Sequence, residues 1–235
     1  MIFKFGEVEY WIKRYEEQKG KNYEWIENYQ SLKPIIDNLN LDKNCKILNI
    51  GCGNSKFSEE LYDDGFINNF NIDYCENVIE FMKLRNINVR KNIVFEVMNA
   101  ENTSYVNDYF DCIFDKGTFD SILSCKNSLT HIAKLTYEIS RILKIGGIYF
   151  LISTGKPENR LDYLNSPHLS FNIKYTGISR IENGREIIHY IYICTKNKNA
   201  NDKLKNFEFF IKELEEEELD IEYYESNKNI KKKYY

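Results

Sequence analysis

Short runs of apolar and β-branched residues alternate, from residue 46 to residue 153, with stretches in which apolar residues recur at helical spacing. Such alternation is typical of a mostly parallel sheet with helices on both faces. The apolar runs predict five strands, at residues 46–50, 69–73, 93–98, 110–115 and 148–153. The intervals between them predict helices at residues 56–64, 77–85, 118–124 and 128–143. Gly146-Gly147 is expected to end the last helix, because glycine often closes a helix in the left-handed conformation.

Two further β-rich runs, at residues 168–178 and 186–195, follow the fifth strand. The Asn183-Gly184 pair between them is a strong signal for a tight hairpin. We therefore expect an α/β fold, with a Rossmann-like, seven-stranded, mostly parallel sheet, helices on both faces and a C-terminal β-hairpin. A dinucleotide-binding domain would instead have six parallel strands.

Helical and charged segments flank the predicted sheet. Helices are expected at residues 7–19 and 24–38, with Gly20 between them, and at residues 202–214. An acidic run at 213–222 and a basic run at 228–233 follow, and such blocks are usually solvated or disordered. The pattern divides the chain into a helical segment at 1–40, a sheet domain at 41–197 and a charged C-terminal helix and tail at 198–235.

Charge and cysteine usage narrow the class of protein. A net charge of −4 provides no general attraction to nucleic acid or anionic membranes. The charged residues Lys4, Glu7 and Glu9 interrupt the start of the chain, and no apolar run approaches a membrane span of roughly 18 residues. Six cysteines stand singly, as expected in a reducing compartment and not in a zinc site. We expect a soluble cytoplasmic protein, a monomer or weak dimer, with no metal, nucleic acid or membrane partner.

A glycine-containing turn follows the first predicted strand, in Ile50-Gly51-Cys52-Gly53-Asn54-Ser55. Gly51 and Gly53 permit a tight turn and a close approach of a ligand to the backbone. Lys56 stands where a dinucleotide fingerprint would have its third glycine. Asp73 ends the second strand about 20 residues further on, where an acidic side chain can accept both hydroxyls of a ribose. The alternatives are a purely structural turn and a helix N-cap.

The third and fourth predicted strands end at the same edge of the sheet. They end in Val97-Met98-Asn99-Ala100 and Asp115-Lys116-Gly117-Thr118-Phe119-Asp120. Four loops should therefore converge on one crevice. The side-chain oxygen of Asn99 is suited to the exocyclic amine of an adenine, and the alternative is an asparagine that caps its own loop.

These linked motifs resemble the methyltransferase-like 13 family of class I S-adenosylmethionine-dependent methyltransferases. The resemblance covers about residues 7–196 and rests on Tyr10-Trp11-Ile12-Lys13-Arg14-Tyr15, Tyr23-Glu24-Trp25, Leu48-Asn49-Ile50-Gly51-Cys52-Gly53-Asn54-Ser55, Asp73-Tyr74 and Asp115-Lys116-Gly117-Thr118-Phe119-Asp120. The family includes eukaryotic lysine methyltransferases of translation elongation factor 1-alpha, among them the form associated with endothelin-converting enzyme 2.

The resemblance implies S-adenosylmethionine as the cofactor and assigns residues to it. Gly51 and the neighbouring Gly53 would lie against the cofactor. The other implied contacts are Asp73 and Tyr74 at the ribose and adenosine, Asn99 and Ala100 at the adenine, and Lys116 at the methionine end. Two positions depart from the pattern, because the family often has Asp where Asn99 stands and many class I enzymes have an acidic residue in place of Asn49.

The resemblance also implies that Trp11, Tyr15 and Trp25 close over the cavity, so that residues 1–40 form a lid. Trp11 and Tyr15 stand four residues apart on one helical face, and a wall of aromatic rings suits a sulfonium cation. Arg14 is placed to meet the cofactor carboxylate. The alternative is that these aromatic side chains are ordinary core. We expect a chain that starts near Asn40 to fold but to lose cofactor affinity.

The expected function is therefore methyl transfer, to a protein lysine of a translation elongation factor. Alternatives are a small-molecule methyltransferase and a non-catalytic module that binds S-adenosylmethionine; an NAD-dependent oxidoreductase is disfavoured by Lys56 and the hairpin. The fourth strand lacks the proline pair expected of enzymes that methylate bases. Asp115, Asp120 and Tyr74 are unranked candidates for the proton acceptor, so the catalytic residue stays unknown.

Overall fold

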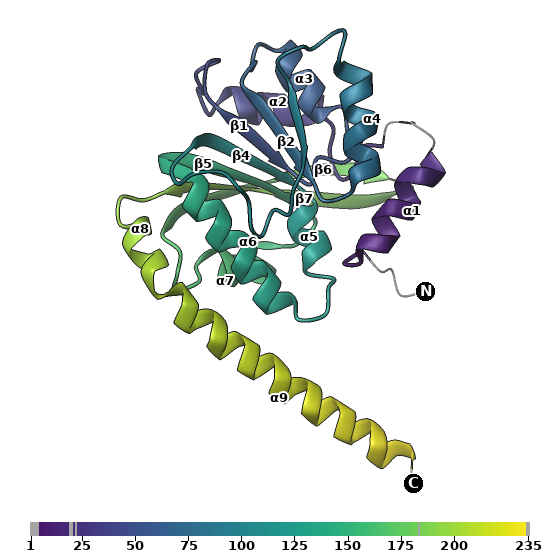
Figure 1. Cartoon of the computed structure of the whole chain (residues 1–235), viewed down its shortest axis with the longest axis vertical. Coiled ribbons are helices and arrows are strands. Elements are labelled where there is room, and N and C mark those ends of the chain that lie inside the picture. Colours follow the sequence, from purple (N-terminus) through teal and green to yellow (C-terminus); the bar gives the residue numbers. More distant parts are fainter. Residues whose placement is uncertain (1–4, 19–20, 22, 183, 234–235) are drawn as a thin grey trace.

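The computed structural model describes residues 5–18, 21, 23–182 and 184–233, except the side chains of Asn206 and residues 222–233. One sheet has the strand order β3-β2-β1-β4-β5-β7-β6 (Figure 1). Its strands are β1 Ile47–Ile50, β2 Asn69–Asp73, β3 Val94–Val97, β4 Phe110–Lys116, β5 Leu143–Ser153, β6 Phe171–Glu182 and β7 Arg185–Lys196. The first five strands pair in parallel, and β7 is antiparallel to both β5 and β6. The expected α/β fold is confirmed.

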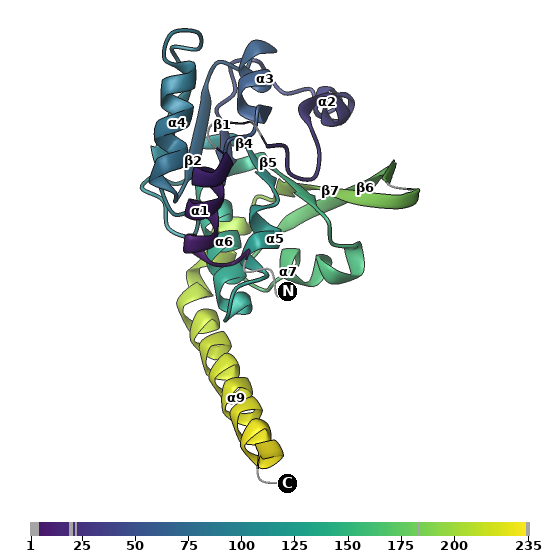
Figure 2. The same ribbon diagram turned by 90° about the vertical axis from the view of Figure 1, so that its right-hand side faces the viewer.

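Helices cover both faces of this sheet (Figures 1 and 2). They are α1 Val8–Gln18, α2 Tyr29–Asp37, α3 Phe57–Asp63, α4 Glu76–Asn86, α5 Thr118–Ile122, α6 Ser128–Ile142, α7 Leu161–Leu164, α8 Ala200–Lys203 and α9 Phe207–Lys233, with 3-10 turns at Pro157–Asn159 and Leu204–Asn206. Leu48 and Ile50 of β1 pack in the core cluster that contains apolar residues of α5, α6 and α7. Ile47 packs with α2 and α3 on the other face. The central strands are apolar on both faces because both are covered.

Gly146-Gly147 does not end a helix, contrary to the sequence prediction. Helix α6 ends at Ile142, and Leu143 is already extended at the start of β5. The pairing of β5 with β4 shifts between the partners Phe110 and Cys112, and Gly146 has a φ of +79° in this irregular stretch. A Cβ on Gly147 would lie 3.0 Å from the Asp111 carbonyl oxygen. These glycines therefore permit a β-bulge at which β4 and β5 approach each other closely.

Helix α2 begins at Tyr29 and not at residue 24 as expected. The side chain of Asn28 accepts a hydrogen bond from the Ser31 N–H and caps the helix. Its apolar face is fully buried, with Tyr29, Leu32 and Ile36 at most 2% exposed. Residues 23–28 run ahead of α2 in non-helical conformation.

Other boundaries differ by a few residues. The hairpin strands are longer toward the turn than expected, and Glu182 pairs with Arg185. Strand β6 begins at Phe171 and not at residue 168 as expected, because its pairing with β7 starts at Phe171 and Lys196. Asn183, Lys19 and Gly20 lie outside the described residues.

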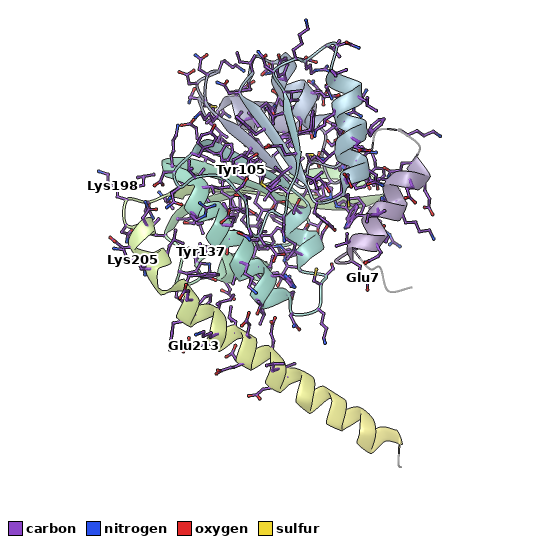
Figure 3. All side chains as sticks on the ribbon, in the orientation of Figure 1. Glu7, Tyr105, Tyr137, Lys198, Lys205 and Glu213 are labelled. Carbon is purple, nitrogen blue, oxygen red and sulfur yellow. The ribbon has the colours of Figure 1, made fainter. Side chains whose placement is uncertain are left out.

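The C-terminal helix α9 extends away from the sheet (Figure 1) and replaces the shorter helix expected at residues 202–214. Tyr137 of α6 lies beside the start of α9 (Figure 3), and its ring stacks on Phe207 at 4.0 Å. Glu218, in the acidic run, is only 8% exposed. Its carboxylate accepts hydrogen bonds from the Leu129 N–H at 2.9 Å and the Thr130 hydroxyl at 2.6 Å. One residue of the acidic run thus caps α6 instead of facing solvent.

Within the described ranges, helices that combine the length and the apolar character needed to cross a membrane do not occur. Groups of three or more His, Cys, Asp or Glu side chains arranged to hold a metal ion are likewise absent from these ranges.

Candidate functional site

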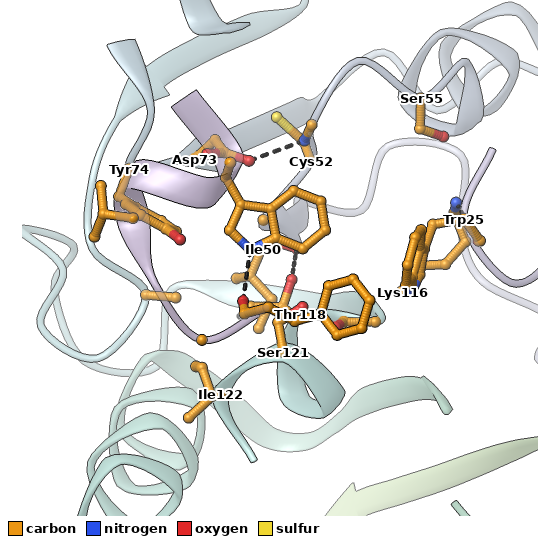
Figure 4. Close-up of a pocket in the computed structure, with 18 of the residues that line it drawn as sticks. Trp25, Ile50, Cys52, Ser55, Asp73, Tyr74, Lys116, Thr118, Ser121 and Ile122 are labelled. Atoms are coloured by element: carbon orange, nitrogen blue, oxygen red, sulfur yellow. Dashed lines mark hydrogen bonds between the residues drawn. The ribbon is translucent and has the colours of Figure 1, made fainter. Parts of the chain in front are cut away.

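A cavity of about 650 Å³ lies at the carboxyl ends of β1, β2, β3 and β4 (Figure 4). Its volume is in the range of about 300–1,000 Å³ that is usual for small-molecule sites. All of the residues predicted to contact a cofactor line it, namely Trp11, Arg14, Tyr15, Trp25, Gly51, Gly53, Asp73, Tyr74, Asn99, Ala100 and Lys116. The loops after β1, β2, β3 and β4 therefore meet at one edge of the sheet, as expected for parallel strands.

The turn after β1 depends on its two glycines. Gly51 has a φ of +57° and Gly53 a φ of +52°, a region that L side chains rarely adopt. The Thr118 hydroxyl donates a hydrogen bond to the Ile50 carbonyl at 3.0 Å. A Cβ on Gly51 would lie 2.0 Å from that hydroxyl oxygen, and a Cβ on Gly53 would lie 2.9 Å from the Tyr15 hydroxyl. The glycines thus permit neighbouring elements to close on the turn.

Asp73 connects this turn to the end of β2. Its buried carboxylate accepts one hydrogen bond from the Gly53 N–H and one from the Cys75 N–H, each at 3.0 Å. Burial raises the pKa of the Asp73 carboxyl. Cys75 is the N-cap of α4, so Asp73 contacts the helix start without being the cap. Each carboxylate oxygen can accept a second hydrogen bond, which leaves acceptors for a ligand.

The predicted adenine residues lie beyond Asp73. Ala100 is buried, and Tyr74 is 39% exposed in the cavity wall. The Asn99 side-chain oxygen accepts a hydrogen bond from the Glu101 N–H at 2.9 Å. This is the loop-capping interaction considered as the alternative for Asn99. The oxygen keeps a second acceptor position, and the amide group keeps its donors.

Aromatic side chains from the N-terminal region form one wall of the cavity. The rings of Trp11 and Tyr15 lie 6.0 Å apart between centroids, and Trp11 and Trp25 lie 5.9 Å apart, edge to face. The Trp11 indole N–H donates to the Phe5 carbonyl at 2.7 Å. Burial raises the pKa of the Tyr15 hydroxyl. From here on the name lid is kept for residues 5–18 and 23–26, which carry this wall, and leaves out helix α2 of the segment 1–40.

Arg14 lies among these rings with one unsatisfied donor. Its guanidinium carbon is 4.5 Å from the Tyr23 ring centroid and 5.4 Å from that of Trp25. One terminal nitrogen donates to the Tyr10 hydroxyl at 2.8 Å. The Arg14 Nε is buried and has no hydrogen-bond partner among the residues that the structure describes. Arg14 itself lines the cavity, where a guanidinium is suited to an anionic group of a ligand.

Asn49 also lines the cavity, where many class I enzymes have an acidic residue. Its amide group donates to the side-chain oxygens of Asn69 at 3.0 Å and Asn71 at 2.7 Å. An acidic side chain could not donate these bonds. The Asn49 oxygen is buried without a hydrogen-bond partner in the described part of the chain.

Lys116 and Gly117 join the lid to the end of β4. The buried Lys116 ammonium donates to the Trp25 carbonyl at 2.9 Å and to the Glu24 carboxylate at 3.2 Å. Desolvation lowers the pKa of Lys116. Gly117 has a φ of +90°, and a Cβ there would lie 2.6 Å from the Trp25 ring. Lys116 therefore provides hydrogen bonds to the lid, and Gly117 leaves room for the Trp25 ring.

Asp115 and Asp120 are not among the described residues that line the cavity. Asp115 accepts hydrogen bonds from the Thr118 and Phe119 N–H groups and from a tyrosine hydroxyl, and burial raises its pKa to about 7. Asp120 binds Thr154 and forms an ion pair with Arg160 at 2.9 Å. Both carboxylates hold the ends of strands in place. Of the three candidate proton acceptors, Tyr74 is the one that lines the cavity.

Other lining residues were not predicted from the sequence, although one of them, Ser55, ends the glycine-containing motif. Ser55, Ser121, Cys125 and a pair formed by Glu101 and His131, with the ring nitrogen 2.9 Å from the carboxylate, also line the cavity. His131 comes from α6, which no motif marked. Glu24 stands in the quoted motif Tyr23-Glu24-Trp25, but its hydrogen bonds to Ser55 and Lys116 join segments far apart in the chain, so no local pattern predicts them.

Comparison with known proteins agrees with this geometry. Residues 41–191 match a family model described as a methyltransferase domain. The eEF1A lysine and N-terminal methyltransferase of Bos taurus is 35% identical over 151 residues, which are 63% of this chain and 22% of that protein. EEF1A lysine methyltransferase 4 of Mus musculus is 26% identical over 186 residues, covering 75% of this chain and 72% of that protein. This chain thus spans about a fifth of the bovine relative's length.

A solved structure has the same fold. It is a SAM-dependent methyltransferase from Methanosarcina mazei, with a TM-score of 0.56 and 19% identity, covering 70% of this chain and 97% of that one. The family match extends from the segment before β1 into β7, well over half of the chain. The resemblance noted in the sequence is confirmed, and the chain belongs to the methyltransferase domain family.

Proposed function

We propose that the chain is a cytoplasmic, S-adenosylmethionine-dependent protein-lysine methyltransferase that acts on translation elongation factor 1-alpha. Relatives named for that activity support the choice of acceptor. The observation that carries the cofactor assignment is the cavity itself, which Asp73, the glycine turn and Arg14 all line.

The residues present fit this cofactor. Asp73 and Tyr74 would hold the nucleoside, Asn99 and Ala100 the adenine, and Arg14 is suited to the carboxylate. The aromatic wall of the lid suits a sulfonium, because ring faces attract cations. When bound, S-adenosylmethionine supplies a methyl group that its sulfonium makes electrophilic.

The protein contributes alignment and exclusion of water. The lid covers the cavity, so that an entering lysine side chain loses its hydration. Desolvation disfavours an ammonium and favours the neutral amine, the form that can attack. Tyr74 and Ser121 are polar groups in the wall that can orient the amine or pass its proton to water.

The test is a reaction of the purified chain with S-adenosylmethionine and purified elongation factor 1-alpha. Peptide mass spectrometry should find one or more CH₂ mass increments on a lysine, and a parallel reaction with S-adenosylhomocysteine should find none. An unmodified factor, with labelled methyl groups recovered on a small molecule of a cell extract, would assign the chain to small-molecule methylation. Cofactor binding without any transfer would make it a binding module.

A further inference from the structure

The carboxylate of Glu24 joins the lid to two other parts of the molecule, the turn after β1 and the end of β4. Its Oε1 accepts a hydrogen bond from the Lys56 N–H at 2.6 Å, immediately before α3. Its Oε2 accepts hydrogen bonds from the Ser55 hydroxyl at 2.8 Å and from the Lys116 ammonium at 3.2 Å. One side chain of the lid thus binds both the turn after β1 and the end of β4.

These contacts fix the position of Trp25. Lys116 donates to the Trp25 carbonyl at 2.9 Å and also to the Glu24 carboxylate, so one ammonium group holds both the Trp25 backbone and the side chain before it. The Trp25 ring lies over Gly117 and 5.9 Å from the ring of Trp11. The position of the aromatic wall therefore depends on the Glu24 contacts.

The residue after Trp25 indicates that this arrangement is under strain. Ile26 has a φ of +66°, which is a true outlier for a β-branched residue. The Glu27 N–H donates to the Trp25 carbonyl at 2.9 Å, so Ile26 is the centre of a three-residue turn of the strained kind. Such a conformation persists where the surroundings fix it on both sides. Glu24 and Lys116 do so before Ile26, and helix α2, which begins at Tyr29, does so after it.

We propose that Glu24 is a positioning residue that latches the lid against the turn after β1, and thereby sets the affinity of the cavity for its cofactor. The latch itself follows from the contacts of Glu24, whereas its effect on cofactor binding rests on the function proposed above. Without the carboxylate, at most one acceptor oxygen remains for the three donors Lys56 N–H, Ser55 and Lys116, so the strained turn relaxes and Trp25 moves away from Gly117.

The test substitutes Glu24→Gln, which keeps the shape and one acceptor oxygen. The chain has two tryptophans, Trp11 and Trp25, and both lie in the lid, so tryptophan emission reports on the lid directly. In the ligand-free variant we expect emission shifted to longer wavelength. Titration calorimetry should show binding of S-adenosylhomocysteine weakened about tenfold or more, the effect of losing hydrogen bonds to a charged group.

Glu27→Gln is the matched control. Glu27 is a buried carboxylate three residues along the chain, and it accepts hydrogen bonds from His189 at 2.8 Å and Ser31 at 2.6 Å, away from the cavity. This variant should have a lower melting temperature with unchanged emission and affinity. If Glu24→Gln fails to fold, Ser55→Ala removes one of the three donors and should shift emission and affinity in the same directions by smaller amounts.

Emission and affinity equal to those of the wild type in Glu24→Gln, or in Ser55→Ala if only that variant folds, would overturn the proposal. A wild-type protein that does not bind S-adenosylhomocysteine would contradict the proposed function instead. In that case the emission of the ligand-free proteins would still decide whether Glu24 latches the lid.

Discussion

The hydroxyl of Tyr15 occupies the space into which a side chain at Gly53 would extend, because a Cβ at that position would lie 2.9 Å from the hydroxyl oxygen. Gly53→Ala should therefore displace Tyr15 from the cavity wall. The φ of +52° adds conformational strain of about 1–2 kcal/mol. Gly146→Ala is the control, since its φ is +79° but nothing lies within 4 Å of a Cβ there. Both variants should melt at lower temperature, and only Gly53→Ala should bind S-adenosylhomocysteine more weakly by calorimetry. Equal affinities would mean that the Tyr15–Gly53 contact does not shape the site.

Asp73→Ala removes the acceptor that holds the Gly53 N–H and that we assign to the ribose hydroxyls. Loss of hydrogen bonds to a charged group should weaken binding of S-adenosylhomocysteine by about 1.5–3 kcal/mol. Calorimetric titration of the folded variant measures this difference. Unchanged affinity would remove Asp73 from the cofactor site and leave it a structural role at the start of α4.

Trp11→Ala tests whether the aromatic wall binds a ligand or is ordinary core. As part of a cation-binding wall, Trp11 should contribute about 0.5–2 kcal/mol to cofactor affinity. As a core side chain, its truncation would instead cost about 3–5 kcal/mol of stability. Melting temperature and cofactor affinity should be measured on the same protein. A large fall in melting temperature with normal affinity in the folded fraction would contradict the lid.

The pKa of Asp115 predicts a pH dependence of stability. Burial raises this pKa to about 7, whereas an unfolded aspartate has a pKa of about 3.9. Between these values the folded state holds a proton that the unfolded state has lost, so the free energy of unfolding falls as pH rises. The contribution is fully present below about pH 4 and is lost as pH rises through about 7.

Asp115→Asn keeps an acceptor oxygen for the Thr118 N–H but cannot ionise. Its melting temperature should therefore decline less than that of the wild type from pH 4 to pH 7, a range set by the same two pKa values of about 3.9 and about 7. Thermal unfolding of both proteins across this range measures the difference. Parallel curves would mean that Asp115 is ionised in the folded protein throughout.

The N-terminal truncation considered from the sequence needs a different boundary. A chain that starts near Asn40 lacks Tyr29, Leu32 and Ile36, which are buried against β1 and α3. Removing such side chains leaves apolar surface exposed, so we now expect this chain to lose cooperative unfolding. A chain that starts at Glu27 keeps α2 and should unfold cooperatively while it lacks the lid. Calorimetric unfolding of the two chains distinguishes the boundaries.

Local patterns were sufficient to predict the strands and the loops that meet at the cavity. Apolar runs separated by helical spacing predict the positions of β1 to β5 along the chain, and parallel strands bring Gly51, Asp73, Asn99 and Lys116 to one edge. The choice of cavity residues on the lid came from the family resemblance, since the spacing of Trp11 and Tyr15 alone also fits a core helix.

The remaining features depend on contacts between distant segments. Glu24 acts through Ser55 and Lys116, which lie 31 and 92 positions away. Gly146 resembles a helix end because its strand pairing with β4 is not visible in the sequence. Glu218 belongs to an acidic run in which the other described acidic side chains, from Glu213 to Asp220, are exposed. Composition therefore predicts a solvated carboxylate where the structure has one that caps α6.

The strand order has a consequence for synthesis. Strand β7 lies between β5 and β6 in the sheet, although it is made last of the seven. While the ribosome adds the residues from Thr154 to Lys196, β5 therefore has an unpaired edge, which favours association with other chains. Every described residue that lines the cavity precedes residue 132. A chain that ends before β7 can thus contain every described lining residue of the cavity and still be insoluble. A growing chain loses this exposed edge once β7 is made and pairs with β5.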